Sequence, residues 1–134
     1  MRKIVLKSIT WIVLAGVMLS PSALLAADAT VTVTKDQAGR EITLKAGNIL
    51  RIELPGQGGT GYLWFLEAKG APPLKFLSET AQKVGEPRPG SPVMQVWLFK
   101  AEQPGTTEVK LSYYRPWEGA GKAVEQVTFN LRIE

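Results

Sequence analysis

The sequence of 134 residues contains no cysteine and no histidine. This absence excludes nucleophilic centres that pair cysteine or serine with histidine, an imidazole general base, and the usual zinc sites. It also excludes disulfides, so the fold must be stabilised by an ordinary hydrophobic core. We therefore expect no catalytic residues, no metal site and no cofactor, and an enzyme would have to use carboxylates, lysine or tyrosine.

The first 27 residues have the pattern of a secretory signal peptide. Three basic residues precede an uncharged, mostly apolar run over residues 8–19, and small residues follow at Ala26, Ala27 and Ala29. This pattern predicts cleavage between residues 26 and 29 and a periplasmic or secreted protein. The alternative is an uncleaved membrane anchor, but the Ser-Pro-Ser segment at 20–22 interrupts the span, so we expect no membrane association after cleavage.

Charge in the rest of the chain is nearly balanced. Three of the 16 basic residues and none of the 12 acidic ones lie in the first 27 residues, which leaves 13 against 12, or about +1. A nucleic-acid-binding surface needs clustered basic residues to neutralise phosphates, and no such stripe is present. We therefore expect no nucleic-acid partner.

Short segments of alternating apolar and polar residues, separated by glycine and proline, fill the remainder of the chain. Leu50, Ile52 and Leu54 fall on one face of such a segment, whereas Arg51 and Glu53 fall on the other. The segments predict strands over residues 30–34, 41–44, 49–54, 62–68, 74–77, 93–101, 106–114 and 124–133. No segment has a sustained helical period.

Seven or eight short strands in about a hundred residues predict an all-β fold, an antiparallel β-sandwich of the immunoglobulin-like kind. A small barrel is the alternative architecture. We expect residues 28–134 to form one domain and the protein to be a monomer.

Three connections, residues 55–61, 85–92 and 115–122, are long and rich in glycine and proline. The first matches the dinucleotide-binding pattern G-x-G-x-x-G over residues 56–61. That pattern requires a helix to begin at its end, but residues 62–66 are typical of a strand, so the match does not indicate a nucleotide site. A glycine-rich loop of this length does allow its backbone to approach another surface closely.

The third connection contains residue types that are enriched at binding hot spots. Arg115 and Trp117 flank Pro116, which fixes the backbone before the tryptophan. We expect Trp117 on the surface and Tyr113 in the core, with an ion pair between Arg115 and Glu118 as the alternative role for the arginine. The tryptophans inside predicted strands, at positions 64 and 97, are expected in the core.

Taken together, the three connections resemble the chagasin-like inhibitors of papain-family cysteine proteases. Family members share an Asn-Pro-Thr-Thr-Gly-Tyr-x-Trp segment, a glycine-rich loop before a Val-Trp-x-Phe-x-Ala strand, and an Arg-Pro-Trp-Glu segment. This chain has Gln-Gly-Gly-Thr-Gly-Tyr-Leu-Trp at 57–64, Gly-Ser-Pro at 90–92 before Val-Trp-Leu-Phe-Lys-Ala at 96–101, and Arg-Pro-Trp-Glu at 115–118. Their order and spacing agree across nearly the whole chain after the predicted signal peptide.

The resemblance implies a reversible, competitive protein inhibitor whose three loops enter the cleft of a papain-family cysteine protease. The first loop would face the catalytic centre, and the other two would contact either side. The protease-binding residues that it implies are Gln57, Gly58, Gly59, Thr60, Gly61, Tyr62, Gly90, Ser91, Arg115, Pro116 and Trp117.

One departure from the family pattern is that residues 57–59 are Gln-Gly-Gly where the family has Asn-Pro-Thr. Added glycines bring backbone freedom that binding must remove, so we expect weaker inhibition or a shifted range of targets.

Two other functions fit the composition. The same loops could serve a periplasmic binding or assembly module with a non-protease partner, because sandwich folds host many functions. A glycosidase could use two of the glutamates at 79, 86, 102 and 118, but their spacing suggests no pair.

Overall fold

The computed structural model describes residues 29–67, 72–86 and 88–134, so the predicted signal peptide lies outside the described residues. The described residues form eight strands and two short 3₁₀ helices, η1 (Lys35–Gln37) and η2 (Ala120–Lys122). The strands are β1 (Thr30–Val33), β2 (Glu41–Leu44), β3 (Ile49–Gly56), β4 (Leu63–Leu66), β5 (Leu74–Lys83), β6 (Val93–Ala101), β7 (Gly105–Tyr114) and β8 (Glu125–Ile133).

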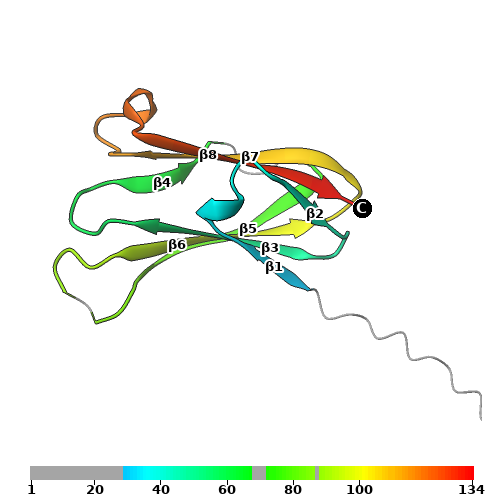
Figure 1. Ribbon diagram of the computed structural model, residues 1–134, viewed down its shortest axis with the longest axis horizontal. Coiled ribbons are helices and arrows are strands. Elements are labelled where there is room, and N and C mark those ends of the chain that lie inside the picture. Colours follow the sequence, from blue (N-terminus) through cyan, green and yellow to red (C-terminus); the bar gives the residue numbers. More distant parts are fainter. Residues whose placement is uncertain (1–28, 68–71, 87) are drawn as a thin grey trace, which may run out of the picture.

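The strands form two four-stranded sheets packed face to face, in the orders β1-β3-β6-β5 and β2-β8-β7-β4 (Figure 1). This arrangement confirms the predicted all-β sandwich. Within the described chain, four strand pairs are antiparallel, while the edge pairs β1–β3 and β2–β8 are parallel. The antiparallel description therefore applies to the centre of each sheet and not to these two edges.

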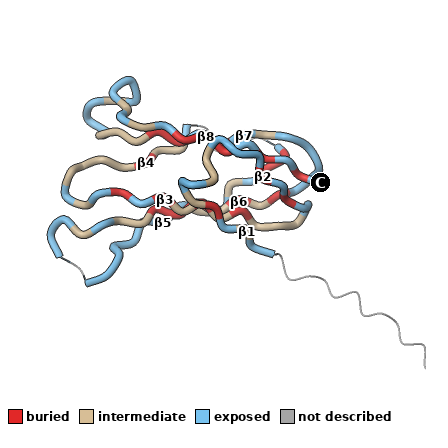
Figure 2. Tube along the Cα trace, viewed as in Figure 1, coloured by how far each residue is buried: buried red, intermediate tan, exposed pale blue. Residues whose placement is uncertain are grey.

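The core lies between the sheets and follows the period-two pattern of the sequence. The inward residues of β3, Leu50, Ile52 and Leu54, are fully buried, and Trp64 and Trp97 are buried as predicted. Figure 2 shows the buried positions along the facing strands, while the connections at both ends of the sandwich are more exposed. Burying these large apolar side chains is the main favourable term for the fold.

Strand β5 is longer than the sequence predicts. The alternating pattern ends at Leu77, but the strand continues to Lys83, and every residue from Glu79 onward is exposed. The register shifts between Phe76 and Ser78, as in a β-bulge, and the second half is held by pairing with β6. Because this half lies over no core, its side chains need no apolar period, and the pattern could not show it.

Candidate binding edge formed by three loops

Three loops lie together at one end of the sandwich, opposite the end that carries the C-terminus (Figure 1). We name them L1 (57–62, between β3 and β4), L2 (84–92, between β5 and β6) and L3 (115–124, between β7 and β8). Register explains the clustering, because Gly56 at the end of β3 pairs with Val93 at the start of β6. Likewise Leu63 at the start of β4 pairs with Tyr114 at the end of β7. Strand β3 extends to Gly56, so L1 begins two residues later than predicted.

L1 is ordered by hydrogen bonds within the loop and by one to Tyr113 on β7. The hydroxyl of Thr60 donates to the carbonyl of Gln57 at 2.9 Å and accepts from the amide of Tyr62 at 3.3 Å. The amide of Gln57 donates to the hydroxyl of Tyr113 at 3.0 Å. At Gly59 the backbone has φ +78°, a left-handed conformation that favours glycine. These bonds close the loop into a compact turn.

L1 and L2 are in direct backbone contact. A β-carbon built on Gly58 would lie 1.9 Å from the carbonyl oxygen of Ser91, and one built on Gly59 would lie 3.4 Å from the α-carbon of Gly90. No side chain fits at position 58 unless the two loops separate. The Gly-Gly departure from the family pattern therefore has a packing role in addition to the freedom inferred from sequence.

L1 and L3 meet through an arginine and a tryptophan. The Nε of Arg115 donates to the carbonyl of Thr60 at 3.0 Å, and its guanidinium carbon lies 4.4 Å from the ring centre of Tyr62. A β-carbon on Gly61 would lie 2.1 Å from Cη2 of Trp117, so the indole covers the glycine. Trp117 is nevertheless 70% exposed. The guanidinium carbon of Arg115 lies 5.9 Å from the centre of this ring, and most of the indole surface remains accessible to a partner.

The ends of L2 are joined by the amide of Val84, which donates to the carbonyl of Pro92 at 2.9 Å, and its interior is ordered by Ser91. The Oγ of Ser91 accepts from the amide of Arg88 at 2.9 Å and lies 2.8 Å from the carbonyl of Arg88 and 3.1 Å from that of Glu86. The amide of Ser91 also donates to the carbonyl of Arg88 at 3.0 Å. Ser91 thus fixes the part of L2 that contacts Gly58.

All eleven residues singled out from the sequence lie on these three loops, and the three loops contact one another through L1. The exposed position of Trp117 is confirmed, and the ion pair considered for Arg115 is also present, with 3.6 Å to Glu118. Tyr113 is half-buried: its ring stacks on Trp64 at 4.8 Å while its hydroxyl reaches L1. The protease-binding role of these residues stays a prediction.

Two supporting residues were missed by the sequence reasoning. One is Tyr113 as the partner of the Gln57 amide, which depends on a contact across 56 residues and has no sequence signal. The other is Gln95, which is buried beneath L1 and hydrogen-bonded to Trp64. The sequence does contain a signal for Gln95, because the period-two alternation of β6 places it on the same inward face as Trp97 and Phe99.

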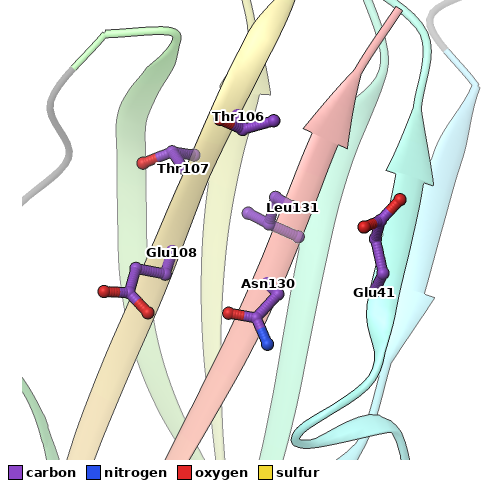
Figure 3. A pocket seen from close by; sticks show the side chains of 6 residues that line it. All are labelled: Glu41, Thr106, Thr107, Glu108, Asn130 and Leu131. Atoms are coloured by element: carbon purple, nitrogen blue, oxygen red, sulfur yellow. The ribbon is translucent and has the colours of Figure 1, made fainter.

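The four glutamates considered for a glycosidase lie on separate elements: β5, L2, the turn after β6, and L3. Two other carboxylates, Glu41 and Glu108, share a shallow hollow of about 270 Å³ on the outer face of the β2-β8-β7 sheet, on either side of Asn130 (Figure 3). Both carboxylates are solvated. Glu41 lies 4.0 Å from the guanidinium of Arg132, and Glu108 lies 3.7 Å from the ammonium group of Lys110. Nothing in this row resembles a catalytic pair.

Within residues 29–67, 72–86 and 88–134, no three potential ligands among aspartate, glutamate, cysteine and histidine come together to hold a metal ion. The same residues include no helix of the length and apolarity needed to cross a membrane. The feature that stands out is the surface formed by L1, L2 and L3, which presents backbone groups, the hydroxyl of Thr60 and the exposed indole of Trp117. Such a surface defines a binding protein built on a β-sandwich.

The chain belongs to the chagasin family of peptidase inhibitors: the profile described as Chagasin family peptidase inhibitor I42 matches residues 43–133. Chagasin from Trypanosoma cruzi is 28% identical over 104 residues, which cover 75% of this chain and 94% of chagasin. Amoebiasin-2 from Entamoeba histolytica is 32% identical over 108 residues, covering 77% and 83% of the two chains. The protein is accordingly an inhibitor and not an enzyme.

Solved structures show the same fold. The crystal structure of the cysteine protease inhibitor EhICP2 from Entamoeba histolytica aligns with a TM-score of 0.70 at 24% identity, over 79% of this chain and 96% of its own. The structure of PbICP-C in complex with falcipain-2 aligns with a TM-score of 0.54 at 26% identity, over 80% and 92% of the two chains. The first of these likenesses is evidence of fold alone.

Proposed function

We propose that this protein is a reversible, competitive inhibitor of papain-family cysteine proteases and that L1, L2 and L3 enter the active-site cleft together. The observation that carries the proposal is the joining of the loops, with Gly58 packed on Ser91 and Gly61 covered by Trp117. The match to the chagasin family of peptidase inhibitors and a relative solved in complex with falcipain-2 support the target class.

The proposed arrangement places L1 at the catalytic centre. Thr60 and Gly61, at its tip, would lie nearest the protease's catalytic cysteine and histidine. Gly90 and Ser91 would contact one wall of the cleft, and Arg115 and Trp117 the other. An exposed tryptophan beside an arginine is the composition expected of an interface hot spot.

Pre-organisation supports tight binding by such an edge. Association costs conformational freedom in every loop that must be ordered, and here L1 is already tied to L2, to L3 and to itself. A standard interface of about 1,600 Å² in total is within reach of three adjacent loops. Because the chain has no cysteine, it forms no mixed disulfide with the protease, so inhibition is by occlusion.

The test is a steady-state assay of papain and a cathepsin L-type enzyme on a fluorogenic peptide, titrated with the protein, with trypsin as control. Competitive, reversible inhibition of the cysteine proteases alone is the expected result. A folded protein that does not inhibit at micromolar concentration would reject the proposal and favour a non-protease partner for the same loops.

The cellular setting is part of the same proposal. We infer that residues 1–27 are a signal peptide, that the inhibitor is periplasmic or secreted, and that it acts as a monomer free of the membrane. The positive residues followed by an apolar run and small residues support this inference. Amino-terminal sequencing of the exported protein and its size in solution provide the tests.

A further inference from the structure

Gln95 joins the two sheets directly beneath the binding edge. It lies on β6, is 4% exposed, and points inward beside the large apolar side chains of the core. Its Oε1 accepts from the backbone amide of Trp64 at 2.7 Å, and its Nε2 donates to the backbone carbonyl of Trp64 at 3.0 Å. One amide side chain therefore satisfies both backbone groups of a residue in the opposite sheet.

These two bonds replace a missing strand neighbour. Trp64 is on β4, which is an edge strand of its sheet and, among the described strands, pairs with β7 alone. A buried backbone N–H or C=O group without a hydrogen-bond partner costs free energy. An edge strand has such unpaired groups along its outer side. Gln95 supplies the donor and acceptor that a further strand would otherwise supply.

The same contact ties together the strands that carry the loops. Gln95 is three residues beyond the end of L2, and Trp64 is two residues beyond the end of L1. Trp64 pairs in register with Tyr113, which lies two residues before L3. The indole Nε1 of Trp64 also donates to the carbonyl of Pro55 at 3.1 Å, on the strand leading into L1.

We propose that Gln95 is a positioning residue for inhibition: its paired bonds to Trp64 hold L1 at the depth where it packs between L2 and L3. This inference rests on the proposed inhibitory function. Gln95 lies in the core and touches no protease itself. It acts through the backbone of Trp64, which sets where L1 leaves the sheet.

A purely structural role is the competing explanation, since removing any buried hydrogen bond destabilises a fold. Ser112 offers a matched control. It is the other buried polar residue of the described chain, and its hydroxyl donates to Glu67 at 2.7 Å. It lies on β7 opposite Phe65 of β4, so both residues affect the same edge strand.

The experiment compares Gln95→Met with Ser112→Ala and the wild type, all expressed from the full sequence, at a temperature where each is folded. Methionine keeps the length of glutamine but removes the donor and the acceptor. We expect both variants to melt at lower temperature, but only Gln95→Met to raise the inhibition constant against papain, by about tenfold or more. An unchanged inhibition constant in folded Gln95→Met would overturn the proposal.

A second measurement keeps the inference testable if Gln95→Met does not fold. In the wild type, hydrogen exchange followed by NMR should show the Trp64 amide protected as strongly as the core amides of β6 and β7. Rapid exchange at Trp64 would show that the hydrogen bonds from Gln95 do not hold this backbone amide, and it would also overturn the inference. Failure of the wild type to inhibit papain would instead reject the proposed function, because Trp64 protection would be unaffected.

Discussion

The indole ring of Trp117 lies so close to Gly61 that a β-carbon on the glycine would be 2.1 Å from Cη2 of the ring. Gly61 also has φ +80°, so two constraints, one steric and one conformational, act at this position. The steric contact fixes where L3 places its exposed indole, and the left-handed backbone at Gly61 fixes the course of L1.

Gly61→Ala should therefore separate L3 from L1 and weaken inhibition. The added methyl group pushes Trp117 from its place, and we expect the inhibition constant to rise by about tenfold or more, as for the loss of a hot-spot contact. The left-handed backbone should also cost about 1–2 kcal/mol of stability. Titration against papain and thermal unfolding measure the two effects.

Gly39→Ala is the matched control for this variant. Gly39 has the same φ of +80°, but nothing lies within 4 Å of the added β-carbon, and the residue is in the turn between η1 and β2. It should lose a similar amount of stability and keep its inhibition constant. If both variants inhibit equally well, the contact between Gly61 and Trp117 does not contribute to binding.

Gly58→Ala tests the contact between L1 and L2. Its β-carbon would meet the carbonyl oxygen of Ser91 at 1.9 Å, and a backbone atom cannot move aside as the end of a flexible side chain can. We expect L1 and L2 to move apart. Because both loops would then be misplaced relative to the protease, several contacts would be lost at once, and we expect the inhibition constant to rise by about tenfold or more.

Gly121→Ala in L3 provides the comparison for that variant, because it adds a methyl group where nothing lies within 4 Å. It should weaken inhibition much less than Gly58→Ala. If the inhibition constant rose equally in the two variants, then added bulk anywhere on the three loops would reduce binding, and the separation of L1 from L2 would not be the cause.

The course of most strands could be predicted from the sequence because burial on one face imposes a period of two. This holds for Leu50, Ile52 and Leu54, and equally for β8, whose inward residues alternate from Val127 to Ile133. The end of β5 was missed because it covers no core. The parallel pairing of β1 with β3 was missed because alternation reports which face is buried and not which strand lies alongside.

The sequence predicts which residues form the candidate binding surface of L1, L2 and L3, but it does not predict the contacts among them. Glycine, proline and tryptophan mark L1, L2 and L3 as unusual connections, and the family motifs name the residues. No local pattern predicts that Arg115 donates to Thr60 or that Tyr113 accepts from Gln57, since those partners are 55 and 56 residues apart. Contacts of this kind depend on the register of strands in three dimensions.

Tyr113→Phe should weaken inhibition while leaving the aromatic packing intact. The ring would still stack on Trp64, but the amide of Gln57 would lose its acceptor at the start of L1. A single hydrogen bond of this type contributes about 0.5–1.5 kcal/mol, so we expect a rise of about two- to tenfold in the inhibition constant.

Tyr114→Phe is the control for the lost hydroxyl. Tyr114 stacks on Phe65 at 4.5 Å, and its hydroxyl makes no hydrogen bond with the described part of the chain. Inhibition should be close to that of the wild type. A larger loss in Tyr114→Phe than in Tyr113→Phe would contradict the role assigned to the Gln57 amide.

Arg115→Lys separates the shape of the arginine from its charge. Lysine keeps the positive charge but lacks the Nε donor that holds the carbonyl of Thr60, and it lacks the planar group that lies over Tyr62. We therefore expect Arg115→Lys to lose nearly as much inhibition as Arg115→Ala. If the role were charge attraction to the protease, lysine would restore inhibition, and the difference from alanine would shrink as salt screens the charge. Measuring both variants against papain at low and high salt decides between these roles. Equal losses that do not change with salt would identify Arg115 as the residue that holds L1 against L3.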